Sequence, residues 1–273
     1  MITISSNNSL VRWEQNENRT GIHNQDGKNI SLILKPTYYK FFNLLAEDLK
    51  DPDHQYASFV DCWMKHCKDL MNDVRAVVEN IIDDFGIVYP ETADDPNTLT
   101  RERVINRVCN KVRGNLAEIL VEKLANEGYL RSFCKNGTYK PVDDPHHEEY
   151  SDGSCLHPNT KLIVEIQIKN YAKGHKVGRE IFDKCSATFH KHICGAKADI
   201  TTPEQMEKYI KTVHQIIFTF TDPEELLLKE KIGMVNVFGP EDIDDLNIQG
   251  DDRGNEAIYS IFEEIAEEID QLI

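Results

Sequence analysis

The chain has 273 residues, 40% of them apolar, which is enough for a substantial buried core. Its mean hydropathy of -0.50 and the lack of any apolar run near the roughly 18 residues that cross a bilayer exclude a membrane-spanning protein. The formal charge of -16 argues against nucleic acid as a partner, but twelve acids and one base give residues 241–273 a charge of -11. Residues 1–240 therefore carry only -5, and a basic groove there is compatible with the composition.

The cysteines and the N-terminus predict the cellular compartment. There are 7 cysteines, an odd number without regular spacing, which favours reduced thiols over a disulfide framework. The first residues, from Met1 to Asn8, have neither a basic start nor a long apolar core, so we expect no secretory signal. Together these features predict a cytoplasmic protein.

Residues 1–98 are predicted to form a mostly helical N-terminal region that serves recognition or oligomerisation. Its first part is polar and rich in turns, with one hairpin expected around residues 25–34. Apolar side chains at helical spacing then predict helices over residues 38–49 and about 55–85, and Gly86 is placed to end the second.

Two groups of cysteine and histidine residues raise the question of a transition-metal site. Cys62 and His66 lie four residues apart on the second predicted helix, which is a spacing that lets them share a metal. No second pair follows at metal-site spacing, which favours core packing for both. Cysteines and histidines between residues 185 and 194 share a helical face only in part, so we expect no zinc site there.

A third helix is predicted from Thr100 to Glu127, with Gly128 as its end. One of its faces is apolar, and a second stripe carries basic residues that include Arg107 and Lys111. Such residues are candidates for contacts with DNA phosphates. A solvated charged face is the more common role for a stripe of this kind.

Residues 161–171, with the sequence KLIVEIQIKNY, have the pattern of a buried strand with one polar face. Glu165, Gln167 and Lys169 alternate with apolar residues and therefore point to the same side. Unpaired buried polar groups cost roughly 1–3 kcal/mol each, so a strand that carries a row of them is predicted to use them. An edge strand with one solvated face is the alternative.

A hairpin before this strand brings a carboxylate next to it. The sequence Ser-Asp-Gly is followed by a short run and by His-Pro-Asn-Thr, which is a turn signal. With the turn centred between Pro158 and Asn159, Asp152 lies across from Glu165 and close to Gln167. Asp152 and Gln167 are therefore predicted to share a site.

The chain after residue 171 predicts the rest of an α/β sheet. A basic loop with Lys173, Lys176 and Arg179 leads into a helix and suits phosphate oxygens. Buried strands are expected over residues 213–220 and 234–238, and their short helical connection predicts parallel pairing.

This order of elements resembles the PD-(D/E)XK nuclease superfamily over roughly residues 100–247. The motif is Ser-Asp at residue 152, fourteen intervening residues, and then Gln167-Ile-Lys169, which is the variant found in some type II restriction and Mrr-like nucleases. The helix that carries Glu118 and ends in Gly-Tyr is similar to the Mrr-type helix. The resemblance implies a restriction-endonuclease-like mixed central sheet flanked by helices, with a nuclease core over residues 99–247 behind a mainly helical N-terminal extension.

The resemblance also implies a divalent metal, Mg²⁺ with Mn²⁺ as a substitute. Asp152 and the amide oxygen of Gln167 are the expected side-chain ligands, and the backbone carbonyl of Ile168 is a third. Glu165 takes the metal role if Gln167 is only structural. The motif lacks the proline that often precedes the aspartate, so acids within residues 143–149 (Asp143, Asp144 and Glu149) are alternatives to Asp152 if the hairpin register differs.

Each remaining residue has an expected role in the hydrolysis of a phosphodiester. Lys169 orients or deprotonates the attacking water or stabilises the phosphorane, and Glu118 completes the site through a metal-bound water. Because Gln167 is neutral where the family pattern has an acid, metal binding should be weak and activity should need millimolar Mg²⁺.

The sequence thus predicts a Mg²⁺-dependent endonuclease that cuts double-stranded DNA, in a type II restriction or defence setting, with a homodimer as the form that cuts both strands. A structure-specific or repair nuclease is one alternative. A non-catalytic interaction module that keeps the fold is another, favoured by the acidic amphipathic helix of residues 248–273, whose apolar face is able to dock a partner.

Overall fold

The computed structural model describes residues 2–6, 9–15, 22–23, 29–33, 35–51, 56–84, 86, 88–90, 100–141, 151–160, 162–183, 185, 202–204, 213–224, 235–246 and 259–270. The chain forms two compact units, Met1–Leu116 with Gln249–Ile273, and Ala117–Ile248. The division falls inside helix α3 (Arg101–Asn126). None of the helices in the described ranges is long and apolar enough to span a membrane.

The first unit begins with a four-stranded antiparallel sheet in the order β1-β2-β4-β3. Its strands are β1 (Ile2–Ser6), β2 (Ser9–Gln15), β3 (Ile22–His23) and β4 (Asn29–Ile33). The expected hairpin corresponds to β3 and β4, but the prediction of a mostly helical start missed β1 and β2. These strands have only 5 and 7 residues, which is too short for their alternation to indicate strands in sequence.

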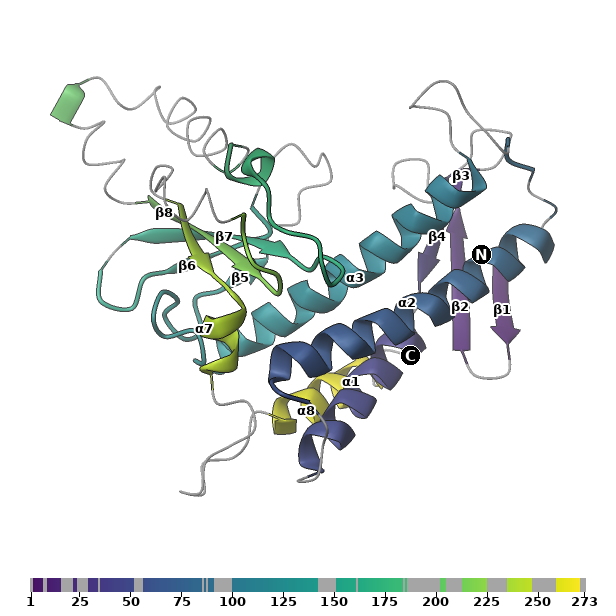
Figure 1. The fold of residues 1–273 in the computed structure, drawn as a ribbon, viewed down its shortest axis with the longest axis horizontal. Coiled ribbons are helices and arrows are strands. Elements are labelled where there is room, and N and C mark those ends of the chain that lie inside the picture. The colour runs from purple at the N-terminus through teal and green to yellow at the C-terminus, as the bar shows by residue number, and fades with distance from the viewer. Residues whose placement is uncertain are drawn as a thin grey trace. The chain divides into compact units, whose positions relative to one another are not determined.

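Three helices build the core of the first unit: α1 (Lys35–Lys50), α2 (Phe59–Asp84) and α8 (Tyr259–Asp270). Aromatic rings join them, because Phe262 stacks on Phe42 at 6.4 Å and on Phe59 at 5.6 Å between ring centroids. Helices α1 and α8 lie side by side (Figure 1). Phe262, Ile265 and Ala266 of α8 are thus buried within the chain and are not available to dock a partner, which was the feature that favoured the interaction-module alternative.

Helix α3 begins and ends where its sequence indicates. The backbone N–H of Arg103 donates to the Thr100 hydroxyl at 3.3 Å, which is an N-cap hydrogen bond. Gly128 follows the helix with a φ of +81°, a left-handed conformation that glycine adopts without strain. In the first unit, Arg75 of α2 reaches Glu102 of α3 with two hydrogen bonds of 2.8 and 2.9 Å.

The second unit is built on a five-stranded mixed open sheet in the order β5-β6-β7-β8-β9 (Figure 1). The strands are β5 (Lys140–Pro141), β6 (Gly153–Leu156), β7 (Ile163–Lys169), β8 (Val213–Thr219) and β9 (Val235–Phe238). The first three pair antiparallel, and β7, β8 and β9 pair parallel. The predicted α/β class and the predicted parallel pairing are both confirmed, and the short helix α7 (Pro240–Asp244) follows β9.

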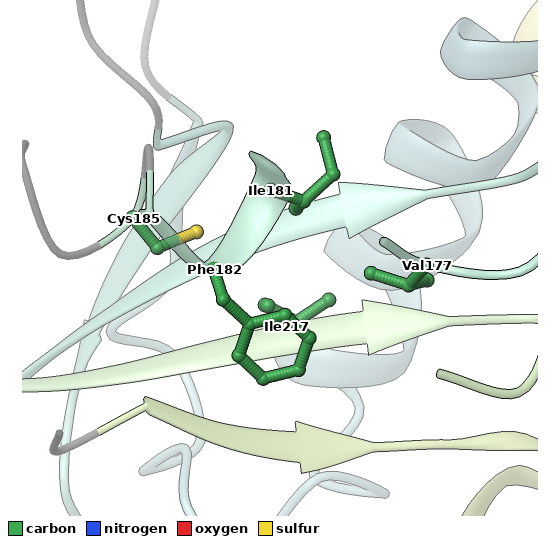
Figure 2. Close-up of a cluster of buried hydrophobic side chains, with 5 residues drawn as sticks. All are labelled: Val177, Ile181, Phe182, Cys185 and Ile217. Atoms are coloured by element: carbon green, nitrogen blue, oxygen red, sulfur yellow. The ribbon is translucent and has the colours of Figure 1, made fainter. Parts of the chain in front are cut away.

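Each face of this sheet packs on its own apolar cluster, because successive strand residues point to opposite sides. On one face, Phe218 stacks on Phe238 at 5.3 Å, and Phe238 meets Phe133 edge-on at 5.2 Å. On the other face, Ile217 packs against the segment that starts at Val177. Figure 2 shows that cluster, in which Phe182 extends from its helical turn toward Ile217.

Candidate active site on the central strand

Asp152 stands directly before β6 and is held by the strand next to it. Its backbone N–H donates to the carbonyl of Ile166 at 2.8 Å. Its carboxylate oxygen Oδ2 accepts the backbone N–H of Ile168 at 2.5 Å and the side-chain amide of Gln167. Three bonds to one strand therefore fix both the position and the orientation of this carboxylate.

The predicted register of this hairpin is wrong by two residues. The last bridges pair Gly153 with Ile166 and Leu156 with Ile163, so the next position places Asp152 opposite Gln167 and not opposite Glu165. The connection takes up residues 157–162 and its centre moves by one residue. Because strand side chains alternate with a period of two, a shift of two changes the partner and keeps the face. The expected sharing of one site by Asp152 and Gln167 is confirmed.

The polar face of β7 is buried. Glu165 is 8% exposed, Gln167 is 5% exposed and Lys169 is partly exposed at the strand end. Strand β7 lies between β6 and β8, so the alternative of an edge strand with a solvated face is wrong. Glu165 pairs across to Ser154 on β6 and to Gln215 on β8, away from the Asp152 carboxylate, which bonds to Gln167 instead.

The amide oxygen of Gln167 has no hydrogen-bond partner among the described residues, although it is buried. The amide nitrogen faces Asp152, because the oxygen in its place would meet a carboxylate oxygen. An unsatisfied buried acceptor costs about 1–3 kcal/mol. A cation that bound both Asp152 and this amide oxygen, with the amide group flipped, would remove that cost.

Tyr139 is a site residue that the sequence did not reveal. It is buried against Gly153, and burial raises its pKa, with the negative charges of Glu122, Asp152 and Glu118 raising it further. The phenol therefore lies within reach of the Asp152 charge and of two acids on α3. A glycine directly after a candidate ligand is the signal that indicates a close approach of this kind.

Glu118 accordingly lies on the part of α3 that belongs to the second unit, near the phenol that also approaches Asp152. The acids of this site do not converge closely, however. Among the described residues, the group in which three metal-ligating atoms lie within 4.8 Å of one another is a different one, in the first unit. A cation at the central strand would thus have few protein ligands and several waters.

An apolar wall closes the polar face next to Lys169. Cys185 belongs to the cluster of Figure 2 and is buried, and burial raises the pKa of its thiol to about 11. The positive charge of Lys169 lowers that pKa, while the charges of Asp152 and Glu165 raise it. The charges of all three residues thus act on the thiol, which is itself buried in the apolar cluster.

The predicted phosphate contacts fall into two groups. Lys173, Lys176 and Arg179 are exposed and follow β7 within the second unit, and Arg179 forms a long ion pair of 3.9 Å with Asp183. Arg107 and Lys111 are exposed on the part of α3 that belongs to the first unit. The alternative acids Asp143, Asp144 and Glu149, and the cysteines and histidines beyond Cys185, lie outside the described residues.

Comparison with models of known families, with curated proteins and with solved structures finds no match for this chain. The resemblance to the PD-(D/E)XK superfamily therefore stays a prediction from the sequence motif and its spacing.

Proposed function

We propose that this chain is a Mg²⁺-dependent endonuclease that hydrolyses phosphodiester bonds of double-stranded DNA. The observation that carries the proposal is the buried amide of Gln167, whose nitrogen donates to Asp152 and whose oxygen lacks a hydrogen-bond partner among the described residues. Lys169 follows two positions later on the same face of the strand. A carboxylate, a neutral oxygen donor and an amine in this order suit phosphodiester hydrolysis.

The donor set fits a hard cation. Asp152 supplies a carboxylate oxygen, Gln167 an amide oxygen and Ile168 a backbone carbonyl, and Mg²⁺ prefers such oxygen ligands while keeping several waters. Glu165 remains the alternative ligand. When bound, Mg²⁺ or Mn²⁺ neutralises charge on the phosphate and lowers the pKa of a coordinated water.

The protein side chains supply the rest of the chemistry. Lys169 follows Gln167 by two positions on β7. In the proposed reaction its ammonium group orients the attacking water and offers positive charge to the phosphate oxygens. Glu118 lies on α3, and its charge acts on Tyr139. In the proposed reaction its carboxylate accepts a hydrogen bond from water at the site. The Cys185 cluster keeps bulk water from one side, which strengthens these charge interactions.

The substrate class follows from the charges around the strand. Exposed Lys173, Lys176 and Arg179 follow the strand end that carries Lys169, where they can bind the DNA backbone without reading its sequence. A cut in both strands needs two such sites, so we propose a homodimer as the active form. The setting that we favour is a restriction or defence system, with a structure-specific repair nuclease as the alternative within the same chemistry.

Cleavage of plasmid and phage DNA tests this proposal. We expect cleavage with Mg²⁺, none with EDTA, and a loss of roughly 10²–10⁴-fold in Lys169→Ala, because a group that assists proton transfer contributes that much. Asp152→Ala should lose at least as much. Lys135→Ala removes an exposed lysine of the same unit away from the motif and serves as the matched control.

A second function is favoured by one observation. Oδ2 of Asp152 already accepts hydrogen bonds from the Ile168 N–H and the Gln167 amide. These bonds satisfy the carboxylate oxygen without a metal, so the arrangement also fits a site that binds none. A DNA-binding module without cleavage would keep this arrangement. Wild-type protein that binds DNA but shows no Mg²⁺- or Mn²⁺-dependent cleavage would favour this second function, and equal cleavage by wild type and both variants would remove the site assignment.

A further inference from the structure

A second cluster of metal-ligating side chains lies in the first unit, apart from the proposed nuclease site. Asp48, Cys62 and His66 each offer one ligand atom, and these atoms all lie within 4.8 Å of one another. Two atoms bound to one tetrahedral zinc lie about 3.3–3.6 Å apart, as follows from Zn–N, Zn–O and Zn–S bonds of about 2.0–2.3 Å. Small side-chain adjustments therefore suffice to bring all three onto one ion.

Two helices position this cluster. Cys62 and His66 lie one helical turn apart on α2, so their side chains share a face. Asp48 comes from the last turn of α1, which packs against that face. The sequence indicated that Cys62 and His66 are able to share a metal, but it indicated no third ligand. The packing of α1 on α2 provides Asp48 as that ligand.

The polar groups are already oriented toward one another. Nε2 of His66 lies 2.8 Å from Oδ2 of Asp48, and the Tyr56 hydroxyl donates to the same oxygen at 3.0 Å. Lys65 in turn donates to the Tyr56 hydroxyl at 2.6 Å. This network holds the carboxylate and the imidazole in place, which is the support that metal ligands receive from groups around them.

From this geometry we infer that Asp48, Cys62 and His66 form a Zn²⁺ site that links α1 to α2. Thiolate, imidazole and carboxylate are the ligand types of zinc, whereas Mg²⁺ takes oxygen ligands only. The side chain of His66 is 11% exposed and that of Asp48 is 41% exposed, so solvent can reach the site from the carboxylate side. A water molecule can supply the fourth ligand there.

The hydrogen bond between Asp48 and His66 explains the orientation of these two side chains without a metal. It gives no role to the thiol of Cys62, which is fully buried in the same group. Zn²⁺ displaces the thiol proton to solvent on binding, and the thiolate, the imidazole and the carboxylate then share one cation. The three ligands together thus account for the arrangement more completely than the hydrogen bond alone.

Metal binding by the full chain tests this inference. The protein is loaded with ZnCl₂, dialysed, and analysed for metal by mass spectrometry, and Co²⁺ replaces Zn²⁺ for absorption spectra. We expect one zinc per chain in wild type and a thiolate-to-cobalt charge-transfer band. Loss of a direct ligand should weaken binding by more than the roughly 10–100-fold that loss of a supporting group costs.

The variants separate this site from other cysteines and from the nuclease motif. Cys62→Ser and His66→Gln should lose the zinc, and Cys62→Ser should also lose the cobalt band. Cys67→Ser, a buried cysteine on the same helix, and Asp152→Ala should keep both. Asp48→Ala removes the more exposed ligand and should also lose zinc, which keeps the test valid if Cys62→Ser does not fold.

Two outcomes would overturn the inference. One is a wild-type chain that binds no stoichiometric zinc. The other is zinc that remains bound, with wild-type affinity, in folded Cys62→Ser and Asp48→Ala, since the ligands would then lie elsewhere, such as among the cysteines and histidines of residues 185–194.

Discussion

The two candidate metal sites differ in how the fold holds their aspartate. The sheet cluster consists of Asp152, Gln167 and Lys169, and the helical cluster consists of Asp48, Cys62 and His66. In the sheet, Asp152 is fixed by backbone and amide donors of one strand, so its position depends on strand register. Between the helices, Asp48 is fixed by His66 and Tyr56, so its position depends on how α1 packs on α2. The sheet offers oxygen donors suited to Mg²⁺, and the helices offer a mixed set suited to Zn²⁺.

This difference explains why the sequence predicts the sheet cluster but not the complete helical cluster. Asp152 and Gln167 belong to one hairpin, and hairpin neighbours follow from a turn and a period of two. Asp48 and Cys62 are separated by a change of helix, and their approach depends on packing that no local pattern specifies. The two clusters therefore also respond to different substitutions.

The largest loss of stability is expected at Gly153, where the backbone next to Asp152 approaches the ring of Tyr139 closely. A Cβ at Gly153 would lie 2.5 Å from Cζ of Tyr139 and closer still to its hydroxyl oxygen, so Gly153→Ala must displace the buried ring. We expect destabilisation of about 1–3 kcal/mol, the usual cost of overpacking, measured by urea unfolding. The helical cluster should keep its affinity for zinc in this variant.

Gly178→Ala is the matched control, because its Cβ would meet Glu224 at 3.4 Å, an ordinary contact. Tyr139→Ala in the Gly153→Ala background should lose less stability than the sum of the two single substitutions, because the clash is gone once the ring is removed. Additive effects of the two substitutions would contradict the assigned clash.

An intermediate effect, on stability and on the Mg²⁺ requirement, is expected when a negative charge is added to the sheet cluster. Gln167→Glu places a second carboxylate beside Asp152. Without a metal the two carboxylates repel each other, and with Mg²⁺ present both attract the cation. The variant should be less stable in EDTA, be restored by Mg²⁺, and need roughly ten-fold less Mg²⁺ for half-maximal cleavage, a change of about 1.4 kcal/mol. Thermal unfolding and cleavage across a Mg²⁺ titration measure both parts.

Gln215→Glu provides the contrast, because it adds a buried carboxylate opposite the alternative ligand Glu165 rather than beside Asp152. Gln215 is also a buried glutamine, on β8, so its replacement should destabilise the protein without rescue by Mg²⁺. The metal assignment of Gln167 fails if Mg²⁺ restores the two variants equally, or restores neither.

The smallest effect concerns the thiol beside the sheet cluster. Burial raises the pKa of Cys185 from 9.0 to about 11, so the folded state favours the neutral thiol. This contribution to stability is complete below pH 9.0 and is lost as the pH rises toward about 11. We expect a loss on the order of 1 kcal/mol by pH 10, measured by urea unfolding at pH 8 and pH 10.

Cys185→Ala should flatten that part of the pH dependence, whatever it does to stability at pH 8. A slope identical to wild type would show that this thiol stays neutral or ionises without cost. Comparison of slopes rather than of absolute stabilities separates the titration from the lost packing.

The sequence predicted what local patterns control. The start of α3 near Thr100, its end at Gly128, the polar face of β7 and the parallel pairing of β8 with β9 all follow from spacing and turn chemistry. The sequence did not predict the N-terminal strands, because they are short. It did not predict the roles of Tyr139 and Asp48 either, because these depend on packing against Gly153 and on the packing of α1 against α2.

The register of the β6–β7 hairpin has a consequence for how such a site changes over generations. Insertion or deletion of two residues in the connection at 157–162 would move Asp152 opposite a different member of the polar row and still keep that row on the same face. A change by a single residue would instead bring Asp152 into register with an apolar neighbour. Evolution of this hairpin is thus expected to change the partner of Asp152 in steps of two residues, with the length of the connection as the variable that selects among them.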